Sequence, residues 1–476
     1  MIAGDMIAGD LLGERARLTP DKMALVEVRS GRRFTYAQLN RRASAMAAYW
    51  TRVRGLQRGD RVGILAENRV EYVDAFFAAG KSGIVLVPLS TRLTPEELAG
   101  VLADAQPRFV MDSALLDSLD LDSPDPTPQI GFVPSPCDPE DLWCLLYTSG
   151  TTGKPKGVRI PHRMVLWNAY NTAISWQLRD DDITPIFTPM YHAGGLAVFL
   201  TPIVAIGGTI LLHSRFDASA VWREAERERA TLIFGVPTIF KMLMEAPEFA
   251  AADLSAVRWC ISGGAPLPRF IIDSYRARGI VFKQGYGLTE AGVNCFAMTP
   301  EDAERKAGSI GKPMMFTEAR VTEGGELWLR GPHVCQGFWN QPEATAAAID
   351  AEGWLHTGDL AHCDGEGFFY IDGRIKDMFI SGGVNVYPAE IEALLVQHPA
   401  VEEAAVIGIP DAQWGEVGVA CIVGRATSEE LAAFLEGRLA HYKFPRRYVF
   451  IDAMPRTPYG KIVKPELRKW IQEGTT

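Results

Sequence analysis

Short apolar runs alternate with longer amphipathic stretches through most of the chain. Three of these runs are RVGILAEN (61–68), IVLVPLS (84–90) and TLIFGVP (231–237), in which Val, Ile, Leu and Phe are concentrated without regular polar alternation. Such runs are typical of strands buried on both faces. The stretches between them, such as 70–83 and 94–105, predict helices. The pattern therefore predicts an α/β fold of doubly wound parallel sheets with right-handed crossovers.

The pattern changes after about residue 311. The segments GELWLRGPHV (325–334) and GFFYIDGRIKDMF (367–379) are short strands with Gly and Asp turns, and they predict a small β-rich unit. We expect a large N-terminal domain over 1–374 and a mobile C-terminal α+β lid over 375–476. Within the lid, the pattern predicts helices at 388–398 and 428–442 and strands at 404–410 and 418–424.

The charge balance narrows the class of partner. The chain has 476 residues, 48 basic and 58 acidic, so its formal net charge is −10. A nucleic-acid binder that works by bulk electrostatics needs clustered excess Lys and Arg, so we expect no nucleic-acid partner. The seven cysteines form no CxxC pair and no Cys/His cluster. Their spacing disfavours a disulfide framework or a zinc site and predicts reduced thiols in a cytoplasmic protein.

Residues 193–212 carry no charge and raise the question of a membrane span. Pro202 in the middle and Gly207–Gly208 near the end predict instead a buried helix, a turn and a core strand, so we expect no transmembrane segment. The first ten residues repeat MIAGD. They show no basic region followed by a long apolar segment, so we expect no secretory signal, and we assign the repeat no place in the fold.

The densest motif is YTSGTTGKPKG (147–157), directly after a predicted buried strand. Its glycines let backbone N–H groups approach an anion, its hydroxyls donate hydrogen bonds and its two lysines add positive charge. Together these properties suit a polyphosphate. Gly150 and Gly153 are too close in sequence for a P-loop. A surface turn rich in Gly and Thr would explain neither the density of donors nor the two lysines.

Two further segments carry residues that suit a nucleotide. In QGYGLTEAG (284–292), two glycines flank Tyr286 and expose an aromatic face on which a base can stack. Thr289 offers a hydroxyl to a phosphate, and Glu290 offers a carboxylate to Mg²⁺, which prefers oxygen ligands. In GWLHTGDL (353–360), Asp359 follows a Gly turn and can accept hydrogen bonds from both ribose hydroxyls. An isolated Asp in a turn is more often a backbone cap.

Six motifs in order resemble those of the adenylate-forming superfamily, which includes acyl- and aryl-CoA synthetases, adenylation domains of peptide synthetases and luciferases. Besides the three segments above, they are SGGAPLP (262–268), GRIKDMFISGGVNVYP (373–388) and PRTPYGKIVK (455–464). The segments FGVPTIF, KAGSIGKPMMFTEARV and ISGGVNVYPAEIE are most similar to fatty-acyl-CoA and feruloyl/4-coumarate-CoA ligases. Two positions depart from the family pattern: Val384, where Glu is commoner, and Tyr459, where Thr is usual.

The resemblance implies a site for ATP and Mg²⁺. Glu290 would bind the metal, and Lys461 would be the catalytic lysine, whose ammonium bridges the carboxylate and the α-phosphate. Thr289 and His192 complete the implied catalytic set. The implied ATP or AMP contacts are Thr148, Ser149, Gly150, Thr151, Thr152, Gly153, Lys154, Lys156, Gly263, Gly264, Ala265, Gln284, Gly285, Tyr286, Gly287, Asp359 and Arg374.

The resemblance also implies a hinge, an acyl pocket and a coenzyme A site. The hinge is Lys376, about which the lid rotates between half-reactions. The implied acyl-pocket residues are His192, Ala193, Gly194, Phe234, Gly235, Gly263 and Gly287, and the implied coenzyme A contacts are Ser381, Gly382, Gly383, Trp414 and Lys443. The pocket segment 190–195 carries no acidic residue to pair with an α-amine, which disfavours an amino-acid substrate.

The function implied is an AMP-forming acid:CoA ligase that uses ATP, Mg²⁺ and coenzyme A, as a monomer or homodimer. A medium- or long-chain fatty acid is the favoured substrate, and a ferulate- or 4-coumarate-type aromatic acid is the alternative. Three other functions stay open: a luciferase-like oxygenase, an adenylation domain that loads a carrier protein supplied in trans, and a non-catalytic nucleotide sensor. The intact Lys461, Glu290 and Lys376 disfavour the sensor.

Overall fold

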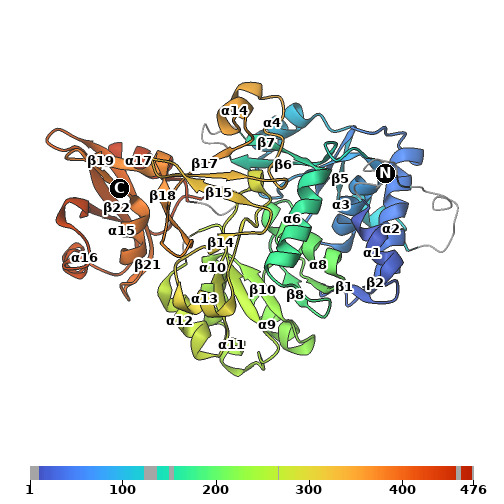
Figure 1. Ribbon diagram of the computed structural model, residues 1–476, viewed down its shortest axis with the longest axis horizontal. Helices are drawn as coiled ribbons and strands as arrows, with labels where there is room; N and C mark the ends of the chain where they lie inside the picture. The colour runs from blue at the N-terminus through green and yellow to red at the C-terminus, as the bar shows by residue number, and fades with distance from the viewer. Residues whose placement is uncertain are drawn as a thin grey trace.

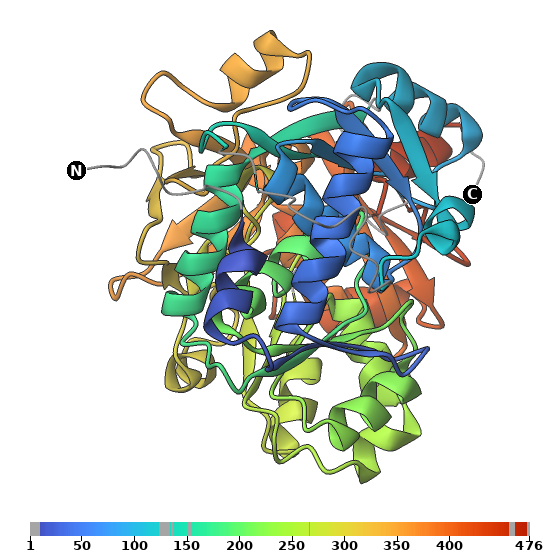
Figure 2. The ribbon, with the colours of Figure 1, turned by 90° about the vertical axis from the view of Figure 1, so that its right-hand side faces the viewer.

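The computed structural model describes residues 10–122, 134, 137–149, 155–265, 267–456 and 462–473. Most of the chain forms one large body, and a smaller C-terminal body lies at one end of it (Figure 1). Seen after a 90° turn, several blue and green helices stand side by side in front of the strands (Figure 2). The predicted division into a large α/β part and a smaller C-terminal part is therefore visible in the ribbon.

The first sheet has the strand order β5-β3-β4-β6-β7. Its strands β5, β3, β4 and β6 are parallel, and β7 returns antiparallel to β6. Helix α3 is buried along its whole length, as expected where a helix lies between a sheet and a second layer of helices. The bounds are β3 Arg61–Leu65, β4 Val85–Pro88, β5 Phe109–Asp112, β6 Leu142–Ser149, β7 Pro155–Pro161, α2 Tyr36–Ala48, η1 Tyr49–Val53, α3 Val70–Ser82, α4 Pro95–Ala105 and α5 Ser113–Ser118.

Two more sheets complete the predicted parallel architecture. One has the order β2-β1-β9-β8, with β1, β9 and β8 parallel, and the other is the parallel set β10-β11-β12. Their bounds are β1 Met23–Glu27, β2 Arg33–Thr35, β8 Ile183–Ile186, β9 Thr209–Leu212, β10 Leu232–Gly235, β11 Trp259–Ser262 and β12 Phe282–Gln284. The helices of this region are α6 His162–Ser175, α9 Ala218–Arg227, α10 Pro237–Glu245, α11 Pro247–Ala251, α12 Arg269–Ala277 and α13 Pro300–Arg305.

The uncharged stretch 193–212 contains the predicted turn and core strand, with two short helices in place of the single helix predicted. It forms α7 (Ala193–Ala197), α8 (Leu200–Ile206) and the core strand β9. Gly207 ends α8 with a φ of +84°, a left-handed conformation that favours glycine. Within the described residues, none of the helices has both the length and the apolar character that crossing a membrane requires.

The β-rich unit is the antiparallel sheet β15-β16-β17-β18. Its bounds are β15 Glu318–Val321, β16 Glu326–Arg330, β17 Leu355–Cys363 and β18 Phe369–Arg374, preceded by the short pair β13 Phe296–Ala297 and β14 Lys312–Pro313 and interrupted by α14 Pro342–Ala348. In Figure 1 this sheet lies between the large body and the C-terminal body. It therefore leads the chain from one body to the other.

The C-terminal body is a five-stranded sheet with helices. Strands β20, β19, β22 and β21 are successive neighbours, and β23 pairs parallel with β22. Their bounds are β19 Phe379–Ser381, β20 Val384–Val386, β21 Val401–Asp411, β22 Gly415–Gly424 and β23 Arg447–Phe450, with α15 Pro388–Leu395, α16 Ser428–Leu435, η4 His441–Lys443 and α17 Lys464–Gln472. The helix predicted over 428–442 ends at Leu435, because the chain turns at Gly437, where φ is +70°.

The N-terminal repeat also requires a correction. Its last residue, Asp10, caps helix α1 (Leu11–Leu18) by accepting a hydrogen bond from Gly13 N at 3.0 Å. Asp10 also binds the buried Lys81 ammonium at 2.5 Å, so it neutralises a cation in the interior. The end of the second MIAGD copy is therefore part of the fold.

Candidate active site

Three parallel strands end side by side and place several of the expected residues together. Gly235, Ser262 and Gln284 are register partners at the carboxyl ends of β10, β11 and β12. Gly263 N donates to Gly235 O at 3.3 Å, and Gly285 N donates to Ser262 O at 2.7 Å. The backbone hydrogen bonding between neighbouring strands therefore continues one residue past the ends of β11 and β12. Ligands of open α/β sheets bind at this edge.

The two glycines beyond these strands leave room for a ligand near the backbone. A Cβ at Gly263 would lie 3.5 Å from the Phe234 ring and 3.7 Å from Gly285 O. Gly264 has a φ of +82°, which favours glycine there. Ala265 follows it in the turn and is exposed. The predicted nucleotide contacts 263–265 therefore lie next to predicted contacts 284 and 285.

The hairpin of β6 and β7 carries the two ends of the motif 147–157. Thr148 pairs with Lys156, and the Lys156 ammonium lies 5.1 Å from the centre of the Phe338 ring. Ser149 is the last residue of β6. The predicted phosphate contacts Gly150, Thr151, Thr152, Gly153 and Lys154 lie outside the described residues.

A buried carboxylate connects the predicted base-stacking and ribose-binding residues. Asp359 is 4% exposed. Its Oδ2 accepts a hydrogen bond from the Tyr286 hydroxyl at 2.6 Å, and its Oδ1 forms an ion pair with Arg374 Nε at 2.9 Å. Asp359 and Arg374 are directly opposite each other on β17 and β18. Burial and the Asp359 charge hold the pKa of the Tyr286 hydroxyl well above its usual value, so this hydroxyl remains a donor.

This arrangement was not deduced from the sequence, which assigned the three residues separate contacts. Thr357 also belongs to it, because its hydroxyl accepts from Asp359 N at 3.1 Å and donates to Leu327 O at 2.6 Å. The Asp359 carboxylate is therefore held by Tyr286 and Arg374, and the Asp359 backbone is held by Thr357. A ribose that binds here meets a carboxylate whose position is already set.

Thr289 and Glu290 lie on the short helix η2 (Thr289–Ala291). The backbone carbonyl of Glu290 accepts from Cys335 N at 2.9 Å, which ties this turn to the following segment. Gly287 faces backbone, since a Cβ there would lie 2.2 Å from Val293 O. Among the described residues, no group of three or more His, Cys, Asp or Glu is arranged to hold a metal. A single carboxylate still fits Mg²⁺, which in nucleotide sites takes most of its ligands from phosphates and water.

Val293 is a residue that the sequence analysis missed. It adopts a left-handed φ of +70°, unusual for a β-branched side chain, directly after Gly292, whose φ is +80°. Strained backbone of this kind is concentrated at functional sites. No sequence pattern predicts this left-handed conformation, because a Val after a Gly is typical of an ordinary turn or strand.

The expected acyl-pocket residues separate into two groups. Gly194 and Gly263 lie on either side of the Phe234 ring, since a Cβ at Gly194 would be 3.4 Å from Phe234 Cε1 and one at Gly263 would be 3.5 Å from Phe234 Cε2. Ala193 instead lines an internal cavity of about 30 Å³ that is also lined by Thr289. The absence of side chains at these two glycines therefore leaves the edges of the half-buried Phe234 ring uncovered.

His192 begins helix α7 and is held by local geometry. Its Nδ1 accepts a hydrogen bond from Gly194 N at 3.1 Å. A neutral imidazole that accepts at Nδ1 carries its proton on Nε2. His192 therefore has Nε2–H as its donor, at the same turn as Gly194.

The predicted hinge follows β18 directly. Lys376 lies in the short helix η3 (Ile375–Asp377), two residues after Arg374. Partial desolvation, followed by the charges of Arg374 and Lys464, lowers the pKa of Lys376, while Asp377 opposes the change. The Lys464 ammonium binds Glu392 at 2.7 Å. The hinge segment is therefore surrounded by charged groups rather than packed in an apolar core.

The predicted coenzyme A residues form a turn covered by an aromatic ring. Gly382 and Gly383 have φ of +59° and +82° and join β19 to β20, and Ser381 is buried at the end of β19. Gly382 N donates to Trp414 O at 2.8 Å, and a Cβ at Gly382 would lie 2.8 Å from the Trp414 ring. Lys443 differs, because its ammonium binds Glu390 of α15 at 2.6 Å.

The predicted catalytic Lys461 lies outside the described residues, as does the atypical Tyr459. The residues on either side of 457–461 pair with each other through an antiparallel bridge between Arg456 and Ile462. The Arg456 guanidinium binds Glu403 of β21 at 2.7 Å. Arg456 and Ile462 are therefore held in the C-terminal body. The other departure, Val384, is exposed at the start of β20.

Comparison with known proteins gives matches over nearly the whole chain. Residues 12–339 match the family described as AMP-binding enzyme, and residues 390–461 match the AMP-binding enzyme C-terminal domain. The chain is 40% identical to a feruloyl-CoA synthase from Amycolatopsis sp, over 96% of this chain and 97% of that protein. It is 37% identical to the long-chain-fatty-acid–CoA ligase FadD13 of Mycobacterium tuberculosis (strain ATCC 25618 / H37Rv), over 97% and 98%.

Solved structures agree with these sequence matches. An ATP-bound MatB from Rhodopseudomonas palustris superposes with a TM-score of 0.88 at 31% identity, covering 99% of this chain and 100% of that chain. A fatty acyl CoA synthetase from Mycobacterium tuberculosis superposes with a TM-score of 0.76 at 35% identity, covering 98% of each chain.

Proposed function

The chain belongs to the AMP-binding enzyme family, and from this premise we propose that it is an acid:CoA ligase that works through an acyl-adenylate. An oxygen of the substrate carboxylate attacks the α-phosphorus of ATP, and pyrophosphate leaves with the electron pair of the broken P–O bond. The thiol of coenzyme A then attacks the acyl carbon, loses its proton and displaces AMP. Phosphoryl transfer of this kind depends on positioning and electrostatic stabilisation.

The observation that carries this proposal is the group formed by Tyr286, Asp359 and Arg374. It places an aromatic ring and an oriented buried carboxylate at adjacent positions, which suits the base and ribose of a nucleotide. Arg374 pairs with Asp359 and directly precedes η3, which contains the hinge. Arg374 therefore connects the proposed nucleotide site to the hinge. When bound at Glu290, Mg²⁺ would supply positive charge to the phosphate oxygens.

We further propose that residues 1–374 and 375–476 act as two domains joined at Lys376. Three exposed apolar side chains lie in this region: Ile375 in the hinge, Ile380 on β19 and Trp414 in the turn between β21 and β22. Exposed apolar side chains at these positions suit a face that docks in one of two domain arrangements. The turn at Gly382 and Gly383 would then approach the adenylate and guide the coenzyme A arm. All seven cysteines lie in the described residues as thiols outside any disulfide, and six of them are buried, which supports a cytoplasmic location.

For the acid, a medium- or long-chain fatty acid is our first candidate, supported by the similarity to the FadD13 ligase. A ferulate-type aromatic acid is the second candidate, and a specific observation favours it. The Phe234 ring lies between Gly194 and Gly263, so a flat ring could stack or pack edge-on where no Cβ intervenes. The two candidates differ in what would occupy the space beside Gly194 and Gly263. A fatty acid would place a flexible chain there, and a ferulate-type acid would place a ring there.

The test is acid-dependent pyrophosphate release in the presence of ATP and coenzyme A, over acetate, octanoate, palmitate, benzoate, 4-coumarate and ferulate. Gly194→Ala is the matching variant, because its Cβ would contact Phe234 at 3.4 Å. If a ring binds there, the variant should reduce kcat/KM for ferulate more than for octanoate. Absence of pyrophosphate release with every acid, from folded protein, would contradict the proposal.

Lys461 is tested by separating the two half-reactions. Lys461→Ala should reduce acyl-adenylate formation by about 10²-fold or more, comparable with removal of an oxyanion donor. Thioester formation from supplied acyl-adenylate should survive, because the lysine acts in the first step. Equal loss in both half-reactions would reject this role for Lys461.

A further inference from the structure

The turn that carries Thr289 and Glu290 ends in a backbone conformation that its residue types do not favour. Gly292 has a φ of +80°, and Val293 has a φ of +70°. The left-handed region is unfavourable for a β-branched residue such as Val, so this conformation persists only where neighbouring contacts hold it. The residue that follows, Asn294, makes such contacts with its side chain.

Asn294 is 2% exposed, and its side-chain amide connects the turn to two helices. Nδ2 donates to Val198 O at 3.1 Å and to Ala197 O at 3.4 Å. Ala197 is the last residue of α7 and Val198 is its C-cap, and the helix itself does not pair the carbonyls at this end. Nδ2 also donates to Thr172 Oγ1 of α6 at 3.0 Å. One buried side chain therefore joins the turn, α7 and α6.

Side-chain packing between α7 and the turn is incomplete. The internal cavity of about 30 Å³ is lined by Leu196 and Ala197 of α7 and by Gly292 and Val293 of the turn. Atoms that face a cavity lack the close contacts through which a packed interior transmits a displacement. The hydrogen bonds of Asn294 therefore connect the two elements where packing alone does not.

The two elements that Asn294 joins contain different parts of the proposed site. Helix α7 begins after His192 and carries Gly194, which lies beside the Phe234 ring of the proposed acyl pocket. The turn carries Glu290, the proposed ligand of Mg²⁺. A shift of α7 is therefore transmitted to the backbone that positions this carboxylate.

We propose that Asn294 is a positioning residue that couples binding of the acid beside α7 to binding of the magnesium nucleotide at Thr289 and Glu290. An acid that occupies the space beside Gly194 fixes the position of α7, and Asn294 then holds the turn in the arrangement that receives the phosphates. Because coupling between two sites is reciprocal, the nucleotide raises the affinity for the acid by the same factor. The inference rests on the proposed function, since it takes the acid and the nucleotide to bind at these two elements.

Calorimetric titration of the full chain measures this coupling directly. The nucleotide is α,β-methylene-ATP with Mg²⁺, whose α–β bridge is not cleaved, and the acids are octanoate and ferulate, each tested separately. With the acid that binds, the wild type should bind the nucleotide at least about fivefold more tightly than without it, which is the lower end of the usual range of coupling. In Asn294→Ala, this ratio should fall below about twofold, because the turn no longer follows α7.

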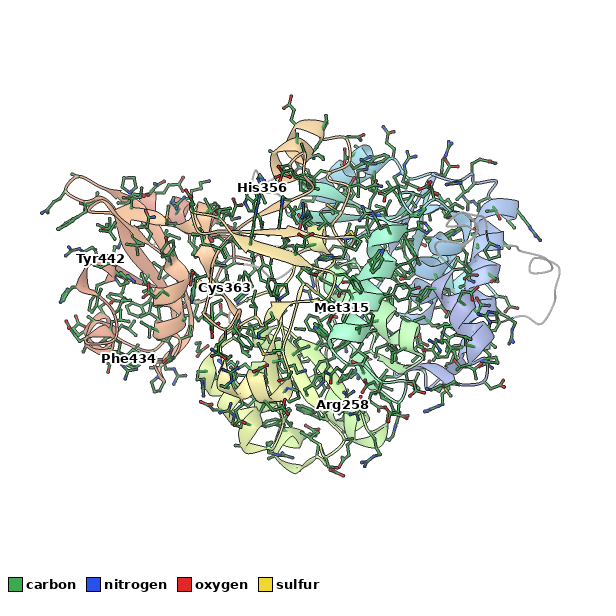
Figure 3. All side chains as sticks on the ribbon, in the orientation of Figure 1. Arg258, Met315, His356, Cys363, Phe434 and Tyr442 are labelled. Atoms are coloured by element: carbon green, nitrogen blue, oxygen red, sulfur yellow. The ribbon has the colours of Figure 1, made fainter. Side chains whose placement is uncertain are left out.

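Asn171→Ala is the matched control for the loss of a buried amide. Asn171 is 1% exposed on α6, and its partners lie in another loop. Its Nδ2 donates to Thr317 Oγ1 at 3.1 Å, and its Oδ1 accepts from Phe316 N at 3.2 Å. The same loop contains Met315, which is labelled beside α6 in Figure 3. This variant should lower the thermal midpoint about as much as Asn294→Ala does and should keep the wild-type ratio.

Two further variants separate the contacts of Asn294. Thr172→Val removes only the acceptor on α6 and leaves the bonds to α7, so it should keep the wild-type ratio. Asn294→Ser retains a donor on a shorter side chain and should give an intermediate ratio. Circular dichroism establishes that each variant folds, and the Ser variant provides the measurement if the Ala variant does not fold.

Three results would overturn the proposal. One is a wild type whose affinity for the nucleotide is the same with and without either acid. Another is a variant of Asn294 that keeps the wild-type ratio. The third is an equal fall of the ratio in Asn171→Ala, which would make the effect a general loss of stability. Failure of the proposed function is a different result, the absence of pyrophosphate release with every acid.

Discussion

Removing the Tyr286 hydroxyl should weaken nucleotide binding through Asp359. In Tyr286→Phe, the Asp359 carboxylate loses the donor at 2.6 Å and keeps Arg374 at 2.9 Å. A hydrogen bond to a charged, buried acceptor contributes about 1.5–3 kcal/mol. If about half of that, about 0.75–1.5 kcal/mol, holds the carboxylate in the orientation that a ribose needs, the dissociation constant for ATP should rise about 4- to 13-fold, since 1.4 kcal/mol corresponds to a factor of about ten.

The assay is ATP binding by calorimetry, paired with 2′-deoxyATP. The wild type should bind ATP more tightly than 2′-deoxyATP, and Tyr286→Phe should lose much of this preference because the carboxylate is no longer positioned for the hydroxyl. Because the raised pKa of Tyr286 keeps its hydroxyl protonated, the effect should be the same between about pH 6 and pH 9.

The matched control is Tyr275→Phe. The Tyr275 hydroxyl is also buried and donates to a backbone carbonyl, Phe240 O, at 3.1 Å, away from the strand ends. This variant should lose about 0.5–1.5 kcal/mol of stability, the usual contribution of a neutral hydrogen bond. Its affinity for ATP should not change. If Tyr286→Phe behaves like Tyr275→Phe, with lower stability and an unchanged ATP dissociation constant, the reasoning about Asp359 is wrong.

Two further predictions concern a buried cation and the glycine turn. Burial and the Arg258 charge lower the pKa of Lys283 to about 8. Between pH 8 and pH 10 the unfolded chain therefore binds more protons than the folded chain. The free energy of unfolding should rise with pH over this window by up to about 3 kcal/mol. Lys283→Met should abolish the rise and exposed Lys469→Met should keep it, as urea unfolding at several pH values would show; a rise that persists in Lys283→Met refutes the assignment. Gly382→Ala should slow thioester formation while adenylation persists, because its Cβ would meet Trp414 at 2.8 Å. Gly31→Ala, with φ of +72° and open space around it, is the control for the left-handed backbone, and equal slowing of thioester formation in both variants would contradict a role for the turn.

Much of the fold could be predicted because burial leaves a direct mark on the sequence. Helix α3 and the elements of 193–212 follow from apolar runs and from glycines at the turns. The end of α16 was missed, because the apolar pattern continues to Leu439 while the backbone turns at Gly437. Asp10 was set aside as part of a repeat, although it neutralises Lys81, since long-range ion pairs leave no local pattern.

In the candidate site too, the sequence predicts which residues take part but not which of them contact one another. Motif chemistry predicted nucleotide roles for Tyr286 and Asp359, and the family resemblance implied one for Arg374. That they bind one another depends on how β17 and β18 pair and on where the turn after β12 lies. The position of Phe234 between two glycines is likewise a product of three separate segments. Contacts of this kind arise from packing at long range and cannot be read from spacing.

The most direct test of the central claim is ATP–pyrophosphate exchange in the absence of coenzyme A, followed by addition of the thiol. The account predicts exchange that depends on a carboxylic acid, because the acyl-adenylate forms reversibly before coenzyme A is needed. Addition of coenzyme A should then yield AMP and the acyl thioester in equal amounts. Thioester formation without acid-dependent exchange, or release of ADP in place of AMP, would contradict an acyl-adenylate route.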